Sequence, residues 1–356
     1  HNAFNKGSIT FFMRFCFLLF VFFALAKPSH ASYNMYKPEN LDLSNNAVLC
    51  MHQDLDGYMW IGTYDGLNLY NGKSTFIYRS ELENEFSLCS NIIHNISQAD
   101  KDHLWISTFL GLNKFSLKER RVVESYPEWP EAKLLASDSE GNTMVICKKN
   151  YISYYMPRLK SFIDIHFPGA DMDNVRGFFV DAQKNFYIIM ADGDMKKVSV
   201  VEGEKASDVR LIIKDLNFHN GNIISAFREG DSVYYISSDR KLYLYDIPSA
   251  KKTFLTDLSI LIDKYGNISQ VTYFKGDLFI SFRDSGLIKL NEQEDYAPEP
   301  INLGVRIFCL LKDQRQDILW IGTDGRGVQM YYKGHDLFGN IMFDDLLPST
   351  QKPIRS

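Results

Sequence analysis

Short apolar runs alternate with turn residues along most of this chain. Residues 54–72 read DLDGYMWIGTYDGLNLYNG, so the runs YMWIGTY and LNLY are bounded by two Asp-Gly pairs and one Asn-Gly pair. These dipeptides favour tight turns between neighbouring strands, and they predict a small antiparallel sheet. Because side chains alternate between the two faces of a strand, Trp60 and Gly62 are expected on one face, with Ile61 and Thr63 on the other.

The same pattern recurs along the chain. LWIST and LWIGT supply two further clear copies, and four fainter copies lie between them. The anchor residues of the copies are Trp60, Trp105, Met144, Tyr187, Tyr235, Phe279 and Trp320, spaced by 45, 39, 43, 48, 44 and 41 residues. A period of this length with strand patterning and no helical periodicity is typical of propeller blades. We therefore predict an all-β fold, a seven-bladed β-propeller with four-stranded antiparallel blades.

The repeated tryptophans and glycines are expected to pack one blade against the next. A large ring beside a residue without a side chain lets the neighbouring sheet approach closely. The alternative is that a tryptophan forms a platform for a sugar ring. Residues 34–43 are expected to add a strand to the last blade and close the ring, which buries every blade face. The predicted structural motif consists of Trp60, Gly62, Trp105, Trp320 and Gly322.

The N-terminal region has the features of an export signal. From Met13 the sequence reads MRFCFLLFVFFALAKPSHAS, with an apolar run of 12 residues and then small residues at Ser29 and Ala31, the two positions that a signal peptidase reads. This predicts a cleaved signal peptide, since a membrane span needs about 20 apolar residues, although retention as an anchor is the alternative. The predicted boundaries are 1–31 for upstream residues plus signal peptide, with translation starting at Met13, 32–340 for the propeller, and 341–356 for a linker toward a second propeller.

Charge and cysteine usage narrow the functional class. The net charge is −5 and the basic residues are scattered, so the sequence disfavours nucleic-acid binding, which needs a basic face. Export permits disulfides, but the cysteines after the signal have neither CxxC spacing nor the density of a disulfide-stapled domain. We expect buried free thiols at Cys50, Cys89, Cys147 and Cys309.

Motifs that carry chemistry are missing from the sequence. There is no GxSxG nucleophile elbow, HExxH, phosphate loop or CxxC pair. The DLDG segment at Asp54 matches the first half of a calcium loop, but the later ligands are missing, so a turn is favoured. His94 and His166 are interpreted as core or rim residues rather than metal ligands. We predict no catalytic residue, no metal site and no cofactor, although two acids facing each other across a propeller mouth can hydrolyse a glycoside.

Propeller topology indicates where a ligand can bind. The turn after the second strand of each blade and the link into the next blade emerge at one end of the ring, here called the mouth. A mixture of Arg, Asp, Asn and aromatic residues there suits a sugar or a uronate. The alternative is that these turns are polar because they are solvated. The candidate ligand-binding residues are Tyr64, Asp65, Arg176, Asp192, Arg240, Arg283, Asp324 and Arg326.

The repeats resemble the two-component regulator propeller family. Its pattern is an Asp, then Gly, LWIGT, GL and an aromatic residue. The first copy meets this pattern with Asp54, Gly57, Trp60, Ile61, Gly62, Thr63, Gly66, Leu67 and Tyr70, and the last copy with Asp313, Trp320, Ile321, Gly322, Thr323 and Gly327. The second copy has Ser107 in place of the glycine, and the third to sixth copies lose the Trp.

This resemblance implies a function that the sequence pattern alone does not. Members of the family form the periplasmic sensor regions of hybrid two-component histidine kinases. They carry two propellers, an Ig-like sandwich, an inner-membrane helix and a kinase with receiver and DNA-binding domains. The chain then corresponds to the first propeller, and the second propeller and kinase domains are missing from it. The implied ligand is an oligosaccharide cut from a glycan, and the implied full-length sensor is a homodimer.

Two other functions are compatible with a propeller. A secreted polysaccharide lyase or glycosidase requires a cluster of acids, Tyr or His at the mouth. A protein-binding scaffold requires an exposed apolar patch. We favour the sensor module, which makes this chain itself no enzyme.

Overall fold

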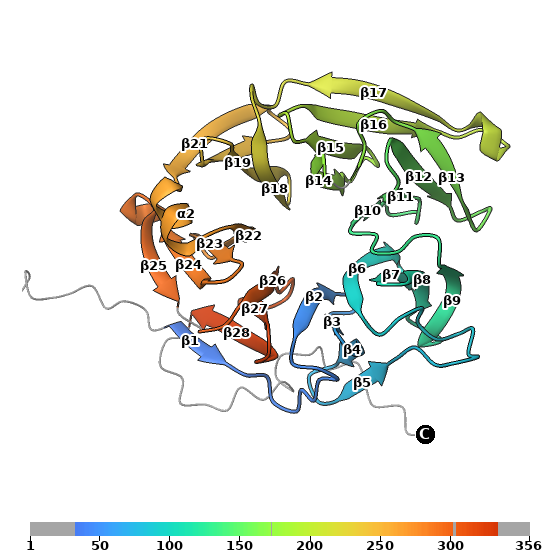
Figure 1. Cartoon of the computed structure of the whole chain (residues 1–356), viewed down its shortest axis with the longest axis horizontal. Coiled ribbons are helices and arrows are strands. Elements are labelled where there is room, and N and C mark those ends of the chain that lie inside the picture. Colours follow the sequence, from blue (N-terminus) through green and yellow to red (C-terminus); the bar gives the residue numbers. More distant parts are fainter. Residues whose placement is uncertain (1–32, 172, 302–303, 334–356) are drawn as a thin grey trace, which may run out of the picture.

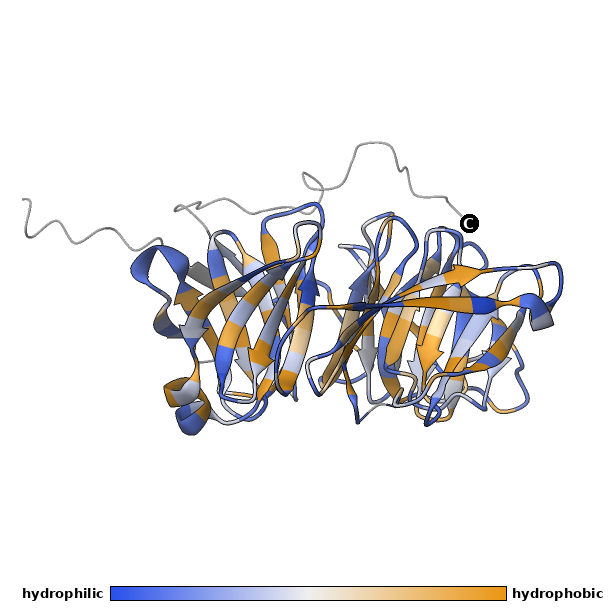
Figure 2. Ribbon diagram, turned by 90° about the horizontal axis from the view of Figure 1, so that it is seen from above, coloured by the Kyte–Doolittle hydropathy of each residue, from blue (hydrophilic) through white to orange (hydrophobic). Residues whose placement is uncertain are grey.

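Each sequence copy folds into one four-stranded antiparallel sheet, and seven such sheets surround a central axis as blades (Figure 1). The computed structural model describes residues 33–171, 173–301 and 304–333. Seen edge-on in Figure 2, the ring is a flat disc. This confirms the predicted all-β, seven-bladed propeller. The predicted signal peptide in residues 1–31 and the predicted linker in residues 341–356 lie outside the described residues.

The first four blades follow the order of the chain from the central axis outward. Blade 1 contains β2 (Val48–Gln53), β3 (Met59–Thr63), β4 (Gly66–Tyr70) and β5 (Thr75–Tyr78). Blade 2 contains β6 (Ile93–Asp100), β7 (His103–Thr108), β8 (Gly111–Ser116) and β9 (Arg121–Tyr126). Blade 3 contains β10 (Leu134–Ser137), β11 (Thr143–Ile146), β12 (Tyr151–Met156) and β13 (Ser161–His166). Blade 4 contains β14 (Val175–Val180), β15 (Phe186–Met190), β16 (Met195–Val201) and β17 (Arg210–Leu216).

The last three blades complete the ring. Blade 5 contains β18 (Ile223–Glu229), β19 (Ser232–Ser237), β20 (Lys241–Asp246) and β21 (Lys251–Asp257). Blade 6 contains β22 (Ile268–Phe274), β23 (Asp277–Phe282), β24 (Gly286–Asn291) and β25 (Ala297–Ile301). Blade 7 contains β26 (Ile307–Lys312), β27 (Ile318–Thr323) and β28 (Val328–Lys333), and its fourth strand is β1 (Tyr33–Tyr36).

The chain closes its own ring through blade 7. Strand β1 pairs antiparallel with β28, and Tyr33 is opposite Lys333 while Tyr36 is opposite Met330. This pairing confirms the closing strand predicted within residues 34–43, although it begins one residue earlier. The first and last sequence copies therefore pack side by side in Figure 1, and Cys309 Sγ donates to the Val48 carbonyl oxygen across the seam at 3.8 Å.

Helices are minor elements in the described part of the chain. They are α2 (Ser259–Tyr265) and the 3-10 helices η1 (Ala206–Asp208) and η2 (Glu292–Glu294), and they lie in connections between strands. The sequence pattern did not predict α2. Within the described residues no helix combines the length and the apolar character needed to cross a membrane.

All seven anchors lie on second strands, but one is displaced by a residue. In blade 5 the position of Trp60 is occupied by Tyr234, which stands three residues before the end of β19 as Trp60 does in β3. Tyr234 packs in the cluster that contains Leu278 of blade 6. The predicted anchor Tyr235 packs the other way, in the cluster with Tyr187 of blade 4. Two adjacent tyrosines fit the same spacing, and only the register of the strand distinguishes them.

The motif tryptophans and glycines pack blade against blade. Trp60, Trp105 and Trp320 are each 1% exposed, which rules out a sugar platform at these rings. A Cβ atom added at Gly62 would lie 2.5 Å from Cys50 Sγ and 2.7 Å from a methyl group of Ile93 in blade 2. The glycine therefore lets the inner strand of blade 2 lie directly against blade 1, as the sequence predicted. The same contact occurs at the seam, where Gly322 lies against Cys309 and Val48.

The Asp residue of the motif organises the turn between the first two strands. Asp54 accepts hydrogen bonds from the backbone N–H of Asp56 at 3.0 Å and of Tyr58 at 2.9 Å, and from Trp60 Nε1 at 2.8 Å. Both carboxylate oxygens thus serve a turn, as favoured over a calcium loop. Asp313 makes the equivalent bond to Trp320 Nε1 at 2.9 Å.

One faint copy retains this turn without the tryptophan. Asp181 accepts from the backbone N–H of Gln183 and Asn185, and the Tyr187 hydroxyl takes the place of the indole at 3.0 Å. A hydroxyl and an indole N–H donate in the same way, so the turn survives the loss of the sequence motif.

Blade 2 uses its turn carboxylate differently. His103 Nδ1 lies 2.7 Å from Asp100 Oδ1, the backbone N–H of Asp102 donates to the same oxygen at 2.9 Å, and Lys114 Nζ lies 3.4 Å from Oδ2. Burial raises the pKa of Asp100, but the hydrogen bonds from His103 and Asp102 and the charges of His103 and Lys114 outweigh it and lower the pKa to about 2.

We expect the contribution of Asp100 to stability to depend on acidity. A carboxylate with a depressed pKa stabilises the fold above its unfolded pKa of about 4 and loses this effect as the pH falls through about 2. The difference in free energy of unfolding between the wild type and Asp100→Asn should therefore be nearly constant from about pH 4 to pH 5 and fall toward zero below about pH 2. Urea unfolding across this range measures it. A difference that persists unchanged at the acid end would contradict the prediction.

Candidate functional site

Backbone hydrogen bonds bring the predicted site loops to one end of the ring. The backbone N–H of Ala191, after the second strand of blade 4, donates to the carbonyl of Asn174 at 2.7 Å. Asp324 of blade 7 makes the same bond to Arg306 at 2.9 Å. Blades 2, 5 and 6 repeat it. The turns and the blade links therefore share the mouth, as the topology predicted, and β-bulges near the start of several inner strands lie at the same end.

Two of the predicted residues meet in one cleft. A cleft of about 800 Å³ opens at the mouth where the links into blades 4 and 5 approach each other. Both Arg176 and Asp192 line it. The other polar lining residues are Asn174, Asp194, Lys196 and Asn222, and apolar surface comes from Met190 and Ile224 among others. A cleft with a few polar groups beside apolar surface suits a small organic ligand.

The polar groups of this cleft are positioned by their own loops. Arg176 donates through Nη1 to the carbonyl of Asp173, which holds its guanidinium against the link into blade 4. Lys196 Nζ is held at 2.7 Å from Asp215 Oδ1. Asp192 Oδ1 accepts from the backbone N–H of Asp194 at 3.1 Å, and the Asp192 side chain is exposed. The cleft thus offers a guanidinium and a carboxylate to the same ligand.

The other predicted residues lie in separate blades. Asp65 forms an ion pair with Arg79 at 3.0 Å and accepts from Asn91 Nδ2 at 3.4 Å, both within the loops of the mouth. Arg240 forms an ion pair with Asp263 of α2. Its backbone carbonyl accepts from the N–H of Leu258, so this arginine anchors the helix that the sequence did not predict.

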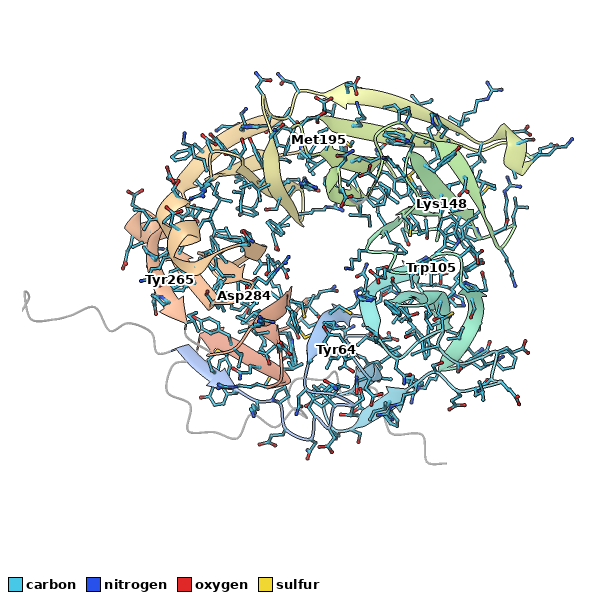
Figure 3. The ribbon with its side chains drawn as sticks, in the orientation of Figure 1. Tyr64, Trp105, Lys148, Met195, Tyr265 and Asp284 are labelled. Atoms are coloured by element: carbon cyan, nitrogen blue, oxygen red, sulfur yellow. The ribbon has the colours of Figure 1, made fainter. Side chains whose placement is uncertain are left out.

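Three exposed side chains and the partly buried Asp324 complete the predicted set. Tyr64 is 47% exposed at the β3–β4 turn, and Arg283 is exposed at the β23–β24 turn. Asp324 and Arg326 belong to the β27–β28 turn of blade 7, where the Arg326 backbone N–H donates to Thr323 Oγ1 at 3.2 Å. Figure 3 shows labelled mouth residues such as Tyr64, Lys148 and Asp284 spread round the ring. Ligand contact by any of the eight stays a prediction.

The His, Cys, Asp and Glu side chains of the described residues were also compared with metal sites and with reactive thiols. No group of three or more His, Cys, Asp or Glu side chains there is arranged to hold a metal ion. The four cysteines are unpaired. Burial raises the pKa of the Cys309 thiol to about 12 and that of Cys50 well above its usual value, so both are packing residues. Cys89, Cys147 and Cys309 are only half-buried as whole residues, which corrects the expectation that all four are buried.

Comparison with known proteins supports the family resemblance. Residues 42–65 match the family model of the two-component regulator propeller. The histidine kinase P4 of Formosa agariphila is 35% identical over 77 residues, which are 21% of this chain and 6% of that protein. The match confirms the resemblance seen in the WIGT repeats.

Solved structures with the same fold come from B. thetaiotaomicron. The extracellular domain of BT3049, described as a hybrid two-component system, aligns with a TM-score of 0.59 at 18% identity and covers 85% of this chain and 42% of that one. The extracellular domain of BT4673 aligns with a TM-score of 0.59 at 15% identity over 85% of this chain and 40% of its own. The chain thus spans less than half the length of each of these three proteins.

Proposed function

We propose that this two-component regulator propeller is a ligand-sensing module of a hybrid sensor histidine kinase, and that it recognises oligosaccharides released from glycans. In this proposal the module lies in the periplasm and the parent protein is anchored in the inner membrane. The match to a histidine kinase and the extracellular domains that share the fold support the sensor role. The observation that carries the ligand class is the mouth cleft, which combines Arg176 and Asp192 with apolar surface.

The chemistry of the cleft is that of sugar recognition. A sugar presents several hydroxyl groups, each of which donates and accepts, beside an apolar ring face. Arg176 supplies donors in a planar fork, the exposed Asp192 supplies acceptors, and Ile224 and Met190 contribute apolar surface. Contacts of this kind select hydroxyl patterns, because a mismatched partner leaves polar groups unpaired.

Signalling follows from differential binding. In the proposed homodimeric sensor, the ligand binds one arrangement of the paired sensor regions more tightly than the other, and this difference in free energy biases the kinase. The second propeller and the kinase belong to the parent protein in this proposal. The continuation of the reading frame provides a direct check, since a parent without a membrane helix and a kinase would contradict the sensor role.

Calorimetric titration with a panel of oligosaccharides tests the ligand class. We expect Arg176→Gln and Asp192→Asn each to weaken binding by about 10-fold or more, because a hydrogen bond to a charged group contributes about 1.5–3 kcal/mol. Arg210→Gln is the matched control, since Arg210 is exposed on β17 of the same blade and away from the cleft. Unchanged binding in both cleft variants would place the ligand elsewhere. Cleavage of a polymer by the purified chain would instead favour a lyase or glycosidase.

A further inference from the structure

The inner strands share an irregularity that the sequence pattern hides. In six of the seven, one residue near the start of the strand is left out of the pairing with the second strand. In blade 1, for example, Val48 pairs with Thr63 and Cys50 pairs with Gly62, so Leu49 is the extra residue of a β-bulge. The extra residues are Leu49, His94, Arg176, Ile224, Ser269 and Phe308.

Each bulge separates a residue that faces the previous blade from one that faces the next. Val48 contacts the Gly322 position in blade 7, whereas Cys50 Sγ donates to the Ile93 carbonyl in blade 2 at 3.7 Å. In blade 4, Val175 packs in the cluster shared with blade 3, and Gly177 lies against Ala226 of blade 5. The extra residue between them is therefore needed by neither interface.

Blade 3 has an equivalent residue beyond the end of its regular pairing. Leu134 pairs with Ile146 and packs toward blade 4. Ala132 is fully buried in the cluster with Trp105 of blade 2. Lys133 stands between them, as the bulge residues do in the other blades, and it is exposed. It is the seventh member of the set.

These positions lie outside the core, unlike the residues that precede them. The residue before the extra one is always Val, Ile or Ala, whereas the extra residue varies from Ser to Phe and Arg. The apolar members Leu49, Ile224 and Phe308 belong to none of the described core clusters, although each has a large side chain of the kind that forms them. Bulges occur preferentially beside functional sites, where they redirect a side chain.

The seven residues divide into two arcs. Blades 2, 3 and 4 contribute His94, Lys133 and Arg176, which offer nitrogen donors on consecutive blades and form the basic arc. Burial and the charge of Lys133 lower the pKa of His94, so Lys133 and Arg176 supply the positive charge and His94 a neutral imidazole. Blades 5, 6, 7 and 1 contribute Ile224, Ser269, Phe308 and Leu49, which are mostly apolar.

His94 carries an unpaired imidazole nitrogen beside an exposed aromatic ring. The buried His94 Nε2 has no hydrogen-bond partner among the described residues, and the nearest carboxylate, that of Glu131, is 4.0 Å away. Phe109 lies beside the same imidazole with 6.3 Å between ring centroids, and it is 47% exposed. Arg176 and Ile224, at the junction of the two arcs, both line the mouth cleft.

We propose that these seven residues, the bulge ring, are the specificity-determining positions of the mouth and select an acidic oligosaccharide. The carboxylate of the ligand lies on the basic arc, and an apolar sugar face lies on Phe308 and Leu49. The bulge ring deepens the proposed function, on which it rests, because it names the class of oligosaccharide and places the ligand across the axis instead of in the cleft alone.

Two probes that differ in charge test the bulge ring with the full chain. We expect trigalacturonate to bind at least about 10-fold more tightly than maltotriose, and Lys133→Gln to reduce this preference, because each carboxylate contact to a cation adds about 1.5–3 kcal/mol. Phe308→Ala should weaken the binding of both sugars about 10-fold through lost contact with the sugar face. Thermal unfolding of Phe308→Ala should differ less from the wild type than that of Trp60→Ala, since the Phe308 ring is only partly buried and packs in no core cluster.

A second phenylalanine provides the matched control. Phe254 is 53% exposed on β21 at the outer rim, and Phe254→Ala should bind both sugars as the wild type does. Equal affinity for the two sugars, or equal binding by the two Phe variants, would overturn the bulge ring. If binding then still depends on Arg176 and Asp192, the proposed function stands without the ring. A chain that binds neither sugar overturns both the ring and the oligosaccharide ligand.

Discussion

Trp60→Ala is expected to lower the free energy of unfolding by about 3–5 kcal/mol, the usual cost of removing a large buried aromatic side chain. The ring is 1% exposed between blades 1 and 2. It lies edge-on to Phe115 of blade 2 with 5.3 Å between ring centroids and stacks at 6.0 Å on Tyr78. Its indole N–H also donates to Asp54 at 2.8 Å, so the variant loosens both a turn and an interface between blades.

Two further variants separate these contributions in urea unfolding. Trp60→Phe retains most of the ring but leaves Asp54 Oδ2 without its indole donor, so a loss of about 1–3 kcal/mol is expected. Leu82 is 95% exposed, and Leu82→Ala should change the free energy of unfolding by less than about 0.5 kcal/mol. If Trp60→Ala were as mild as Leu82→Ala, this ring would not hold the two blades together.

Gly62→Ala should destabilise the fold by about 1–3 kcal/mol, the typical cost of overpacking a core. The added methyl group would lie 2.5 Å from Cys50 Sγ and 2.7 Å from Ile93 Cγ2, both of which are buried. The strands must then separate or the side chains must leave their rotamers. A larger side chain, as in Gly62→Val, should cost more, because the space is closed by blade 2.

A double-mutant cycle identifies the contact responsible. Cys50→Ala removes the sulfur atom that the new methyl group meets, so the double variant should be less destabilised than the sum of the two single variants, by about 0.5 kcal/mol or more. Ser107 occupies the equivalent position in blade 2 and already carries a Cβ atom. Its buried hydroxyl has no hydrogen-bond partner among the described residues, so Ser107→Ala should be nearly neutral. Strict additivity at Cys50 and Gly62 would contradict the steric explanation.

The sequence predicted the number and type of the blades because each blade repeats the same order of strands and turns at a nearly constant spacing. Three copies carry Trp and Gly at positions that pack one sheet on the next, and the weaker copies keep the spacing. In blade 4 the reason is visible, since Tyr187 replaces the indole donor to Asp181. Spacing could not choose between Tyr234 and Tyr235, because adjacent residues of a strand differ only in the face that they occupy.

The candidate site was less predictable because its contacts depend on side-chain reach and on local irregularities. Topology placed the loops at the mouth correctly, but it could not show that Asp65 is paired with Arg79 or that Arg240 holds a short helix through Asp263. It also missed the bulges, since one extra residue inverts the alternation of a strand without changing its composition. The signal that locates Phe308 appears when the inner strands are aligned with one another, because a Val, Ile or Ala then precedes a variable residue in every blade.

The closure of the ring by β1 has a mechanical consequence. Because Tyr33 is paired directly with Lys333, the two ends of the ring are adjacent and lie away from the mouth. Tension applied between these ends would break the backbone pairs of β1 and β28 in succession, like a zip, instead of shearing all of them at once. A pulling force between these two ends therefore separates β1 from β28 first, and it reaches the other blades only after this pairing is broken.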